Sequence, residues 1–97
     1  MRLLFHREAV DESIEASNYY EARRHGLGRE FDDELEAAFV TILENPRMWP
    51  REPIPDVHRY RMTRFPYVII YNVEADAVTV YAIAHSSREP GYWLDRL

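Results

Sequence analysis

The sequence contains no cysteine and no lysine, and only three of its 97 residues are glycine. Without cysteine there is no disulfide framework and no thiolate metal site. None of the glycines stands in a phosphate-binding loop pattern. The four histidines lie in different predicted elements, whereas a zinc site needs three or four converging ligands. We therefore expect neither a metal nor a cofactor.

Long hydrophobic runs are also missing. The two longest uncharged runs, Phe65 to Val73 and Ala77 to Ser87, are shorter than the roughly 18 apolar residues that span a bilayer. The opening segment has too short an apolar core for a signal peptide. A chain of 97 residues that is 46% hydrophobic can bury one adequate core. We expect a cytoplasmic protein with one domain over residues 1–97 and no membrane contact.

Charge is distributed unevenly along the chain, whose net charge is −5. Residues 7–45 carry four arginines and eleven acids, a balance of −7, whereas residues 57–73 carry three arginines and no acid. The overall sign disfavours free nucleic acid as a tight partner, because non-specific binding depends on neutralising phosphates. All twelve cationic residues are arginine, whose forked guanidinium suits phosphate or carboxylate.

Apolar periodicity predicts two helices in the N-terminal half. The first spans roughly Arg7 to Arg24, with Val10, Ile14 and Ser17 at helical spacing. Its acids, Asp11, Glu12 and Glu15, are expected to face water. After the turn at Gly26, a second helix places its apolar residues at helical spacing: Leu27, Phe31, Leu35, Ala38 and Ile42. Asn45-Pro46 ends it, because proline disfavours helical backbone in the preceding residue.

Strand signals dominate the C-terminal half. Val57 to Arg64 shows strand alternation, and Tyr67 to Val73 and Ala77 to His85 are rich in β-branched and aromatic residues. Arg2 to Phe5 forms a further short strand, at the edge or centre of the sheet, and Pro46 to Pro55 is an extended surface connection. The predicted class is α+β: an N-terminal strand, an antiparallel helical hairpin packed on a mainly antiparallel β-sheet (β-α-α-β-β-β), and a short C-terminal tail.

Three arginines near the first of these C-terminal strands are candidate binding residues. Strand alternation places Arg59 and Arg61 together, on the face opposite Tyr60 and Met62. Such a pair suits a phosphate or an acidic partner segment. The alternative is that both are exposed strand residues that pair with the acidic helices. Arg64 precedes a turn at Phe65-Pro66, which also suits a structural role.

The ending AIAHSSREPGYW brings further candidates together. His85 and Arg88 leave the last strand, and Glu89-Pro90-Gly91 is expected to turn Tyr92 and Trp93 back toward the sheet. A histidine, an arginine and a tyrosine have the chemistry to move protons and stabilise a phosphate in RNA cleavage. In the alternative, the two aromatic residues cap the core while His85 and Arg88 hold the tail by hydrogen bonds. For Trp93 we expect packing.

Several segments together resemble the RelE/ParE superfamily of bacterial type II toxins. They are FHREAVDE, YYEAR and FDDELEAA in the N-terminal half, the NP after the second helix, and RMTRFPYVIIY and AIAHSSREPGYWLDR in the C-terminal half. The likeness covers nearly the whole chain. It implies a small toxin that a cognate antitoxin neutralises in a hetero-oligomer, with DNA contacted only through the antitoxin.

The resemblance implies two alternative mechanisms on one fold. RelE-like members cleave mRNA on the ribosome, and ParE-like members poison DNA gyrase without a nuclease site. For a nuclease, the catalytic candidates are Arg59, Arg61, Arg88, Tyr92 and His85. However, Val68 stands where RelE-like nucleases tend to carry a further arginine, and the FPY turn and HxxRxPxYW ending are closer to the ParE-like branch.

We therefore expect a ParE-like toxin that acts on gyrase, with a ribosome-dependent mRNA endonuclease as the alternative. A non-toxic antitoxin-binding module with the same fold is the third hypothesis. Whether the chain is an enzyme depends on the target. The residues expected to contact the target are Arg59, Arg61, Arg64, His85, Arg88, Tyr92 and Arg96.

Overall fold

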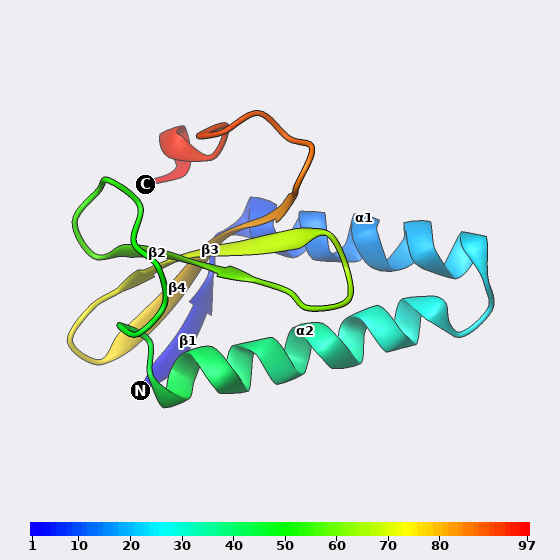
Figure 1. Cartoon of the computed structure of the whole chain (residues 1–97), viewed down its shortest axis with the longest axis horizontal. Coiled ribbons are helices and arrows are strands. Elements are labelled where there is room, and N and C mark those ends of the chain that lie inside the picture. The colour runs from blue at the N-terminus through cyan, green and yellow to red at the C-terminus, as the bar shows by residue number, and fades with distance from the viewer.

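The computed structural model describes residues 1–97 and contains one four-stranded sheet with a helical hairpin (Figure 1). In chain order the elements are β1 (Arg2–Phe5), α1 (Arg7–Arg23), α2 (Leu27–Glu44), β2 (Val57–Arg61), β3 (Tyr67–Val73), β4 (Ala77–His85) and the 3-10 turn η1 (Leu94–Arg96). This order confirms the predicted α+β class. Neither helix has the length and apolar content needed to cross a membrane.

The sheet is mixed, with the strand order β1-β4-β3-β2. The hairpin pairs β2–β3 and β3–β4 are antiparallel, and β1 lies at the edge, parallel to β4. In the β3–β4 pair, Ile70 lies opposite Ala82 but Tyr71 lies opposite Val80. Tyr81 is therefore the extra residue of a β-bulge, a feature that bends the strand and leaves backbone groups without a ladder partner.

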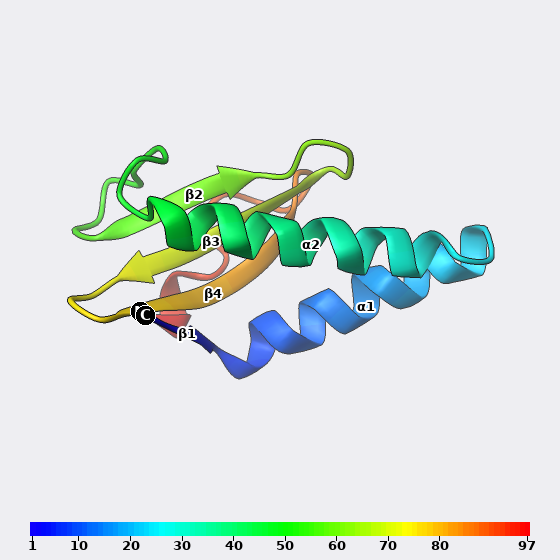
Figure 2. The same ribbon diagram turned by 90° about the horizontal axis from the view of Figure 1, so that it is seen from below.

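Helix α2 crosses one face of the sheet (Figure 2). It supplies most of the buried helical residues of the main core cluster. As its spacing predicts, it buries Phe31, Leu35, Ala38 and Ile42. These residues pack with sheet residues such as Ile69 and Val80 in one apolar cluster. Burying a side chain as large as Phe31 stabilises the fold by about 1.5–3 kcal/mol.

Helix α1 does not bury the residues that its spacing suggested. Val10 and Ile14 are 40% and 52% exposed, whereas Ala9 and Ala16 are buried. The small alanines allow α1 to approach the rest of the core closely, which larger apolar side chains would prevent. The first helix also ends at Arg23, one residue earlier than predicted.

The turn between the helices depends on two glycines. Gly26 has a φ of 88°, in the left-handed region that favours glycine. At Gly28 a Cβ atom would lie 2.7 Å from the backbone oxygen of Ser17, so only glycine fits this crossing of α1 and α2. The Glu21 carboxylate accepts hydrogen bonds from both glycine N–H groups, which holds the pKa of that carboxyl below its usual value.

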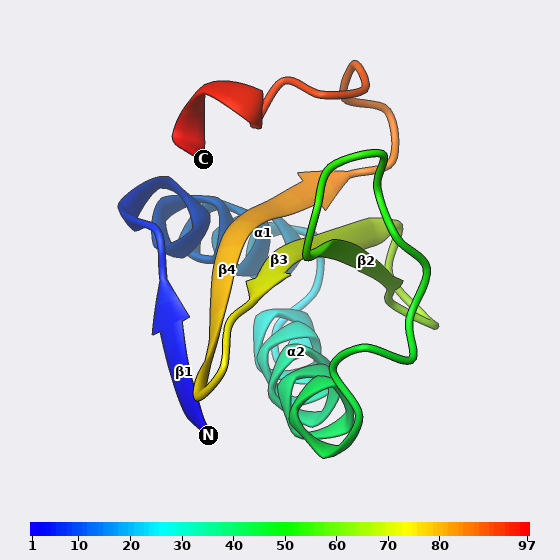
Figure 3. The ribbon, with the colours of Figure 1, turned by 90° about the vertical axis from the view of Figure 1, so that its left-hand side faces the viewer.

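The other face of the sheet is covered by the C-terminal tail, on the side opposite α2 (Figure 3). Trp93 is only 4% exposed and packs with Val57, Ile70 and Ala82 in a second apolar cluster. The structure thus agrees with the expected packing of Trp93. A large aromatic side chain such as Trp93 suits this position, because it removes much apolar area from water.

Strand β2 is shorter than predicted. It ends at Arg61, and the chain from Met62 to Pro66 forms a turn, in which the Met62 N–H donates to the Tyr67 carbonyl at 2.9 Å. Arg64 therefore lies outside the strand. The proline-rich segment has no helix or strand of its own, as expected, but its backbone runs beside β2, where the Arg59 N–H donates to the Pro50 carbonyl.

Candidate functional site

The first candidate surface is the outer part of the tail-covered sheet face. Arg59 and Arg61 project from this face, with Ile70 and Val68 as their respective register partners on β3. A hollow of about 360 Å3 opens there, and its lining includes Trp49 beside both arginines. We call this hollow the arginine hollow. Both arginines lie on this face because strand side chains alternate, and Tyr60, between them, packs against the core on the helical side.

The two arginines of this hollow differ in their freedom. The Arg59 guanidinium donates to the Glu52 carboxylate and to the Arg51 carbonyl, both at 3.0 Å. Arg61 is exposed and makes no hydrogen bond or ion pair within the chain. Arg61 is therefore the cation of this pair whose charge is available to a partner.

The wall beside these arginines comes from the proline-rich segment. The Trp49 carbonyl lies 2.7 Å from Nδ1 of His58, and the Tyr71 hydroxyl donates to the Pro46 carbonyl at 2.6 Å. Both His58 and Tyr71 are buried, so these hydrogen bonds fix the segment against the sheet. Trp49 is held in place at the mouth of the arginine hollow for this reason.

Arg64 lies away from the arginine hollow, on the side of α2. Its guanidinium forms an ion pair with Glu30 at 2.7 Å, and its backbone N–H donates to Glu34 at 2.8 Å. Hydrogen bonding to Arg64 is also the largest cause of the lowered pKa of the Glu30 carboxyl. These contacts tie the β2–β3 turn to α2, which is the structural role that its position before the turn suggested.

His85 and Arg88 lie where β4 gives way to the tail. His85 accepts a hydrogen bond from the Ser87 N–H at Nδ1, and the Ser87 hydroxyl lies 2.7 Å from the same nitrogen. The His85 ring meets the Tyr67 ring edge-on, with centroids 5.1 Å apart. Arg88 stacks on the face of Tyr92 at 3.7 Å and makes no ion pair. Both residues border a cleft beside α1.

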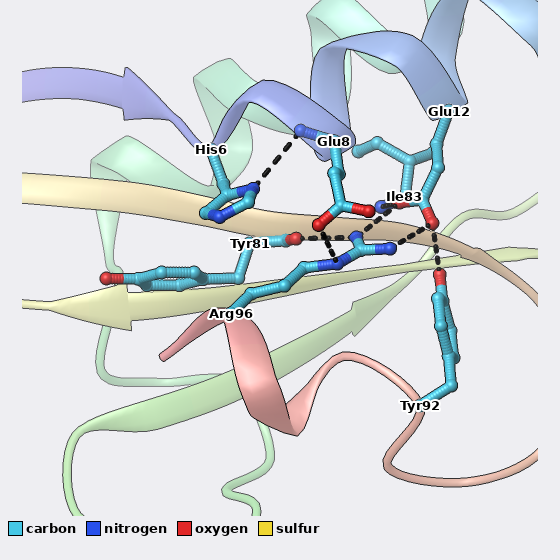
Figure 4. Close-up of polar contacts among 7 residues, drawn as sticks. All are labelled: His6, Glu8, Glu12, Tyr81, Ile83, Tyr92 and Arg96. Atoms are coloured by element: carbon cyan, nitrogen blue, oxygen red, sulfur yellow. Dashed lines mark hydrogen bonds and ion pairs between the residues drawn. The ribbon is translucent and has the colours of Figure 1, made fainter.

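Glu12 of α1 connects the helical hairpin, the sheet and the tail (Figure 4). Its carboxylate accepts from the Ile83 N–H at 2.9 Å, from the Tyr92 hydroxyl at 2.7 Å, and from two nitrogens of Arg96 at 3.0 Å. Arg96 also donates to the carbonyl of the bulge residue Tyr81. We call this set of contacts the Glu12 latch.

The Glu12 latch satisfies backbone groups that the sheet leaves unpaired. Strand β1 ends opposite Val80, so β4 has no strand neighbour on that side from Tyr81 onward. Glu12 and Arg96 replace the missing strand by bonding the Ile83 N–H and the Tyr81 carbonyl. The side chains of Glu12 and Arg96 are only 14% and 7% exposed, so their mutual charge compensation is required.

The environment of Tyr92 affects its acid-base chemistry. Burial is the largest cause that raises the pKa of its hydroxyl far above the usual value, and the hydrogen bond to Glu12 acts in the same direction. A phenol in this state keeps its proton throughout the neutral range. Within the Glu12 latch, Tyr92 is therefore a poor general base.

Comparison with known proteins assigns the chain to a family. A family model described as "ParE toxin of type II toxin-antitoxin system, parDE" matches residues 3–90. The chain belongs to the ParE toxin family. No curated protein sequence matches this ParE-family chain significantly.

Solved structures share the fold of this ParE-family chain. A chromosomal ParDE system from P. aeruginosa matches with a TM-score of 0.69 and 17% identity, covering 88% of this chain and 95% of that one. The isolated E. coli RelE toxin matches with a TM-score of 0.65 and 23% identity, covering 98% and 94%. A mutant of E. coli RelE in complex with a peptide of antitoxin RelBc gives 0.64 and 20%, covering 99% and 93%.

The predicted site residues of this ParE-family chain thus fall into separate groups. Arg59 and Arg61 line the arginine hollow, and His85 and Arg88 border the cleft beside α1. Tyr92 and Arg96 bind Glu12. Arg64 pairs with α2. No group of three or more histidine, aspartate or glutamate side chains lies close enough to hold a metal ion.

Glu12 and Trp49 were missed as parts of these surfaces. Glu12 was expected to face water, but it is one of the least exposed carboxylates that form ion pairs. Its position offers a signal, since it lies three residues after buried Ala9 and four before buried Ala16, on the border of the buried helix face. For Trp49 no sequence pattern indicated its place beside β2.

Proposed function

We propose that this ParE-family chain inhibits growth in the cytoplasm by poisoning DNA gyrase, and that a cognate antitoxin neutralises it in a hetero-oligomer. In this proposal the arginine hollow and the adjoining tail dock onto the target as a surface. Among the predicted site residues, Arg61 and Arg88 are the exposed arginines that form no ion pair, and both are available for acidic groups of a partner.

The state of Tyr92 is the observation that most favours docking over RNA cleavage, because it removes one of the two candidate bases, Tyr92 and His85. RNA cleavage by attack of a 2′-hydroxyl needs a group that removes its proton, and that group must reach the nucleophile in the right protonation state. Tyr92 instead donates a hydrogen bond to Glu12, and burial raises the pKa of its hydroxyl. A docking surface needs no such base, so the same geometry is compatible with a protein target.

The charge of the arginine hollow also favours docking over RNA cleavage. Glu52 lies 3.0 Å from the Arg59 guanidinium and offsets its charge, which leaves Arg61 as the unpaired cation of the hollow. A scissile phosphate develops extra negative charge in the transition state and is usually held by several free donors. One unpaired arginine is a weaker cradle for that charge than a cluster of them.

The first test is labelling of cells after induction of the chain from a tightly repressed promoter. Gyrase poisoning predicts early loss of thymidine incorporation while methionine incorporation continues. Purified protein should then inhibit supercoiling by gyrase, and Arg61→Ala should weaken inhibition about tenfold through loss of a target contact. Arg47→Ala is the matched control, because Arg47 is an exposed arginine without partners in the chain.

An early collapse of methionine incorporation, together with cleavage of ribosome-bound mRNA and intact supercoiling activity, would instead support the mRNA endonuclease. In that case Arg88→Ala should abolish cleavage and spare antitoxin binding. If induction affects neither label while the antitoxin still binds, the chain is a non-toxic antitoxin-binding module. These three outcomes separate the three hypotheses.

A further inference from the structure

A second recess lies on the helical side of the sheet, away from the arginine hollow. Two adjoining hollows of about 290 and 560 Å3 share Tyr19, Tyr67 and His85 in their linings. Helix α1 forms one wall, and the ends of β3 and β4 form the other. We call this recess the tyrosine cleft. It is separate from the hollow that contains Arg59 and Arg61.

The walls of the tyrosine cleft contain aromatic rings that contact one another. Tyr67 is edge-on to His85 at 5.1 Å and also contacts Tyr20 and the buried ring of Phe31. Tyr19 is 51% exposed and packs edge-on against Tyr20 at 5.2 Å. Surfaces built from tyrosine and histidine offer apolar contact area together with polar edges. They suit an inserted aromatic side chain better than an aliphatic one.

Two arginines without carboxylate partners flank the aromatic walls. Arg23 lines the larger hollow, where its guanidinium donates to the Tyr19 hydroxyl at 2.6 Å. Arg88 lines the smaller one. Among the acids of the cleft, Glu12 is compensated by Arg96, which leaves only Glu15 without an ion pair. The cleft therefore has a small positive excess, although residues 7–45 as a whole carry −7.

We propose that the tyrosine cleft docks an acidic protein segment of the macromolecular target, with a carboxylate at Arg23 or Arg88 and an aromatic side chain between Tyr19 and Tyr67. The proposal rests on the proposed function and adds a second contact region to it. A protein segment fits better than a nucleic acid, because the acidic hairpin beside the cleft repels a continuous run of phosphates. His85 takes part from this cleft and not from the arginine hollow.

The test compares a cleft variant with a matched surface variant. Tyr19→Ala/Arg23→Ala removes two exposed side chains of one wall, so the fold should survive with an unchanged urea midpoint. We expect its affinity for immobilised gyrase to fall about tenfold or more, while affinity for the antitoxin stays within about twofold. Arg23→Glu should weaken gyrase binding more than Arg23→Ala. Arg29→Ala, an exposed arginine of α2 outside the cleft, should change neither affinity.

Each other result overturns the docking proposal in a defined way. Unchanged gyrase affinity rejects it, and a loss confined to antitoxin binding assigns the cleft to the antitoxin. If the variant instead loses binding to a labelled single-stranded RNA that the wild-type protein binds, the cleft is assigned to nucleic acid. If wild-type protein fails to bind gyrase, the proposed function fails. Growth inhibition by Tyr19→Ala/Arg23→Ala then tests the cleft alone, because wild-type toxicity in that variant rejects a target contact there.

Discussion

Removal of the Glu12 carboxylate should destabilise the fold strongly, although the sequence pattern placed Glu12 among the water-facing acids of the first helix. Glu12→Ala leaves Arg96, with a side chain only 7% exposed, without its closest charge partner and with only the exposed Glu8 carboxylate at 3.5 Å. It also leaves the Ile83 N–H and the Tyr92 hydroxyl without acceptors. Breaking a buried ion pair from one side costs about 3–5 kcal/mol. Some rehydration of the freed tail reduces that cost, so we expect about 3 kcal/mol.

Urea unfolding of the purified chain, followed by tryptophan fluorescence, measures this loss. With a denaturant slope of about 1.5 kcal/mol per molar, 3 kcal/mol corresponds to a midpoint lower by about 2 M. Trp93 belongs to the tail and packs on the sheet, so its emission reports the same region. Asp11→Ala is the matched control, because Asp11 is the exposed neighbouring carboxylate and makes no contact of this kind. It should change stability by about 0.5 kcal/mol or less.

A second variant separates charge from shape. Glu12→Gln keeps an oxygen for the Ile83 N–H but removes the charge that compensates Arg96, so it should lie between wild type and Glu12→Ala. Adding Arg96→Met to Glu12→Gln should recover stability, since no buried unpaired charge then remains and the freed Glu8 is exposed to water. A Glu12→Ala midpoint equal to that of Asp11→Ala would refute the reasoning, because it would mean that the latch contributes nothing.

Two further predictions concern packing and pH. Gly28→Ala should cost about 1–3 kcal/mol in urea unfolding, because its Cβ would meet the Ser17 backbone oxygen at 2.7 Å; an unchanged midpoint would show that the helices can separate freely. Burial raises the pKa of Tyr67 to about 12, from the ordinary 10.0. The stability that the protonated Tyr67 hydroxyl contributes to the fold is therefore fully present below about pH 10 and is lost as the pH rises toward 12. Tyr67→Phe should reduce the fall of the free energy of unfolding over this pH range, measured by urea unfolding. An identical fall in both proteins would contradict the prediction.

The amino-acid sequence by itself determined the order of helices and strands. The spacing of Phe31, Leu35, Ala38 and Ile42 reads directly as one face of a helix, and the structure buries that face. The alternation around Tyr60 placed Arg59 and Arg61 together on the opposite face of β2, as observed. Such signals are local, because each repeats within a few residues of the chain. The family resemblance also depends on short segments and was confirmed.

Only the tertiary structure decided which polar residues meet. Glu12 and Arg96 are 84 residues apart, and no local pattern pairs a helix acid with an arginine at the far end of the chain. Their contact depends on where β1 stops and where the bulge at Tyr81 opens the edge of β4. For the same reason the predicted site residues divide between the arginine hollow, the tyrosine cleft and the Glu12 latch, and Arg64 lies apart from all three. Periodicity assigns a side chain to a face, but the packing of elements determines its neighbours.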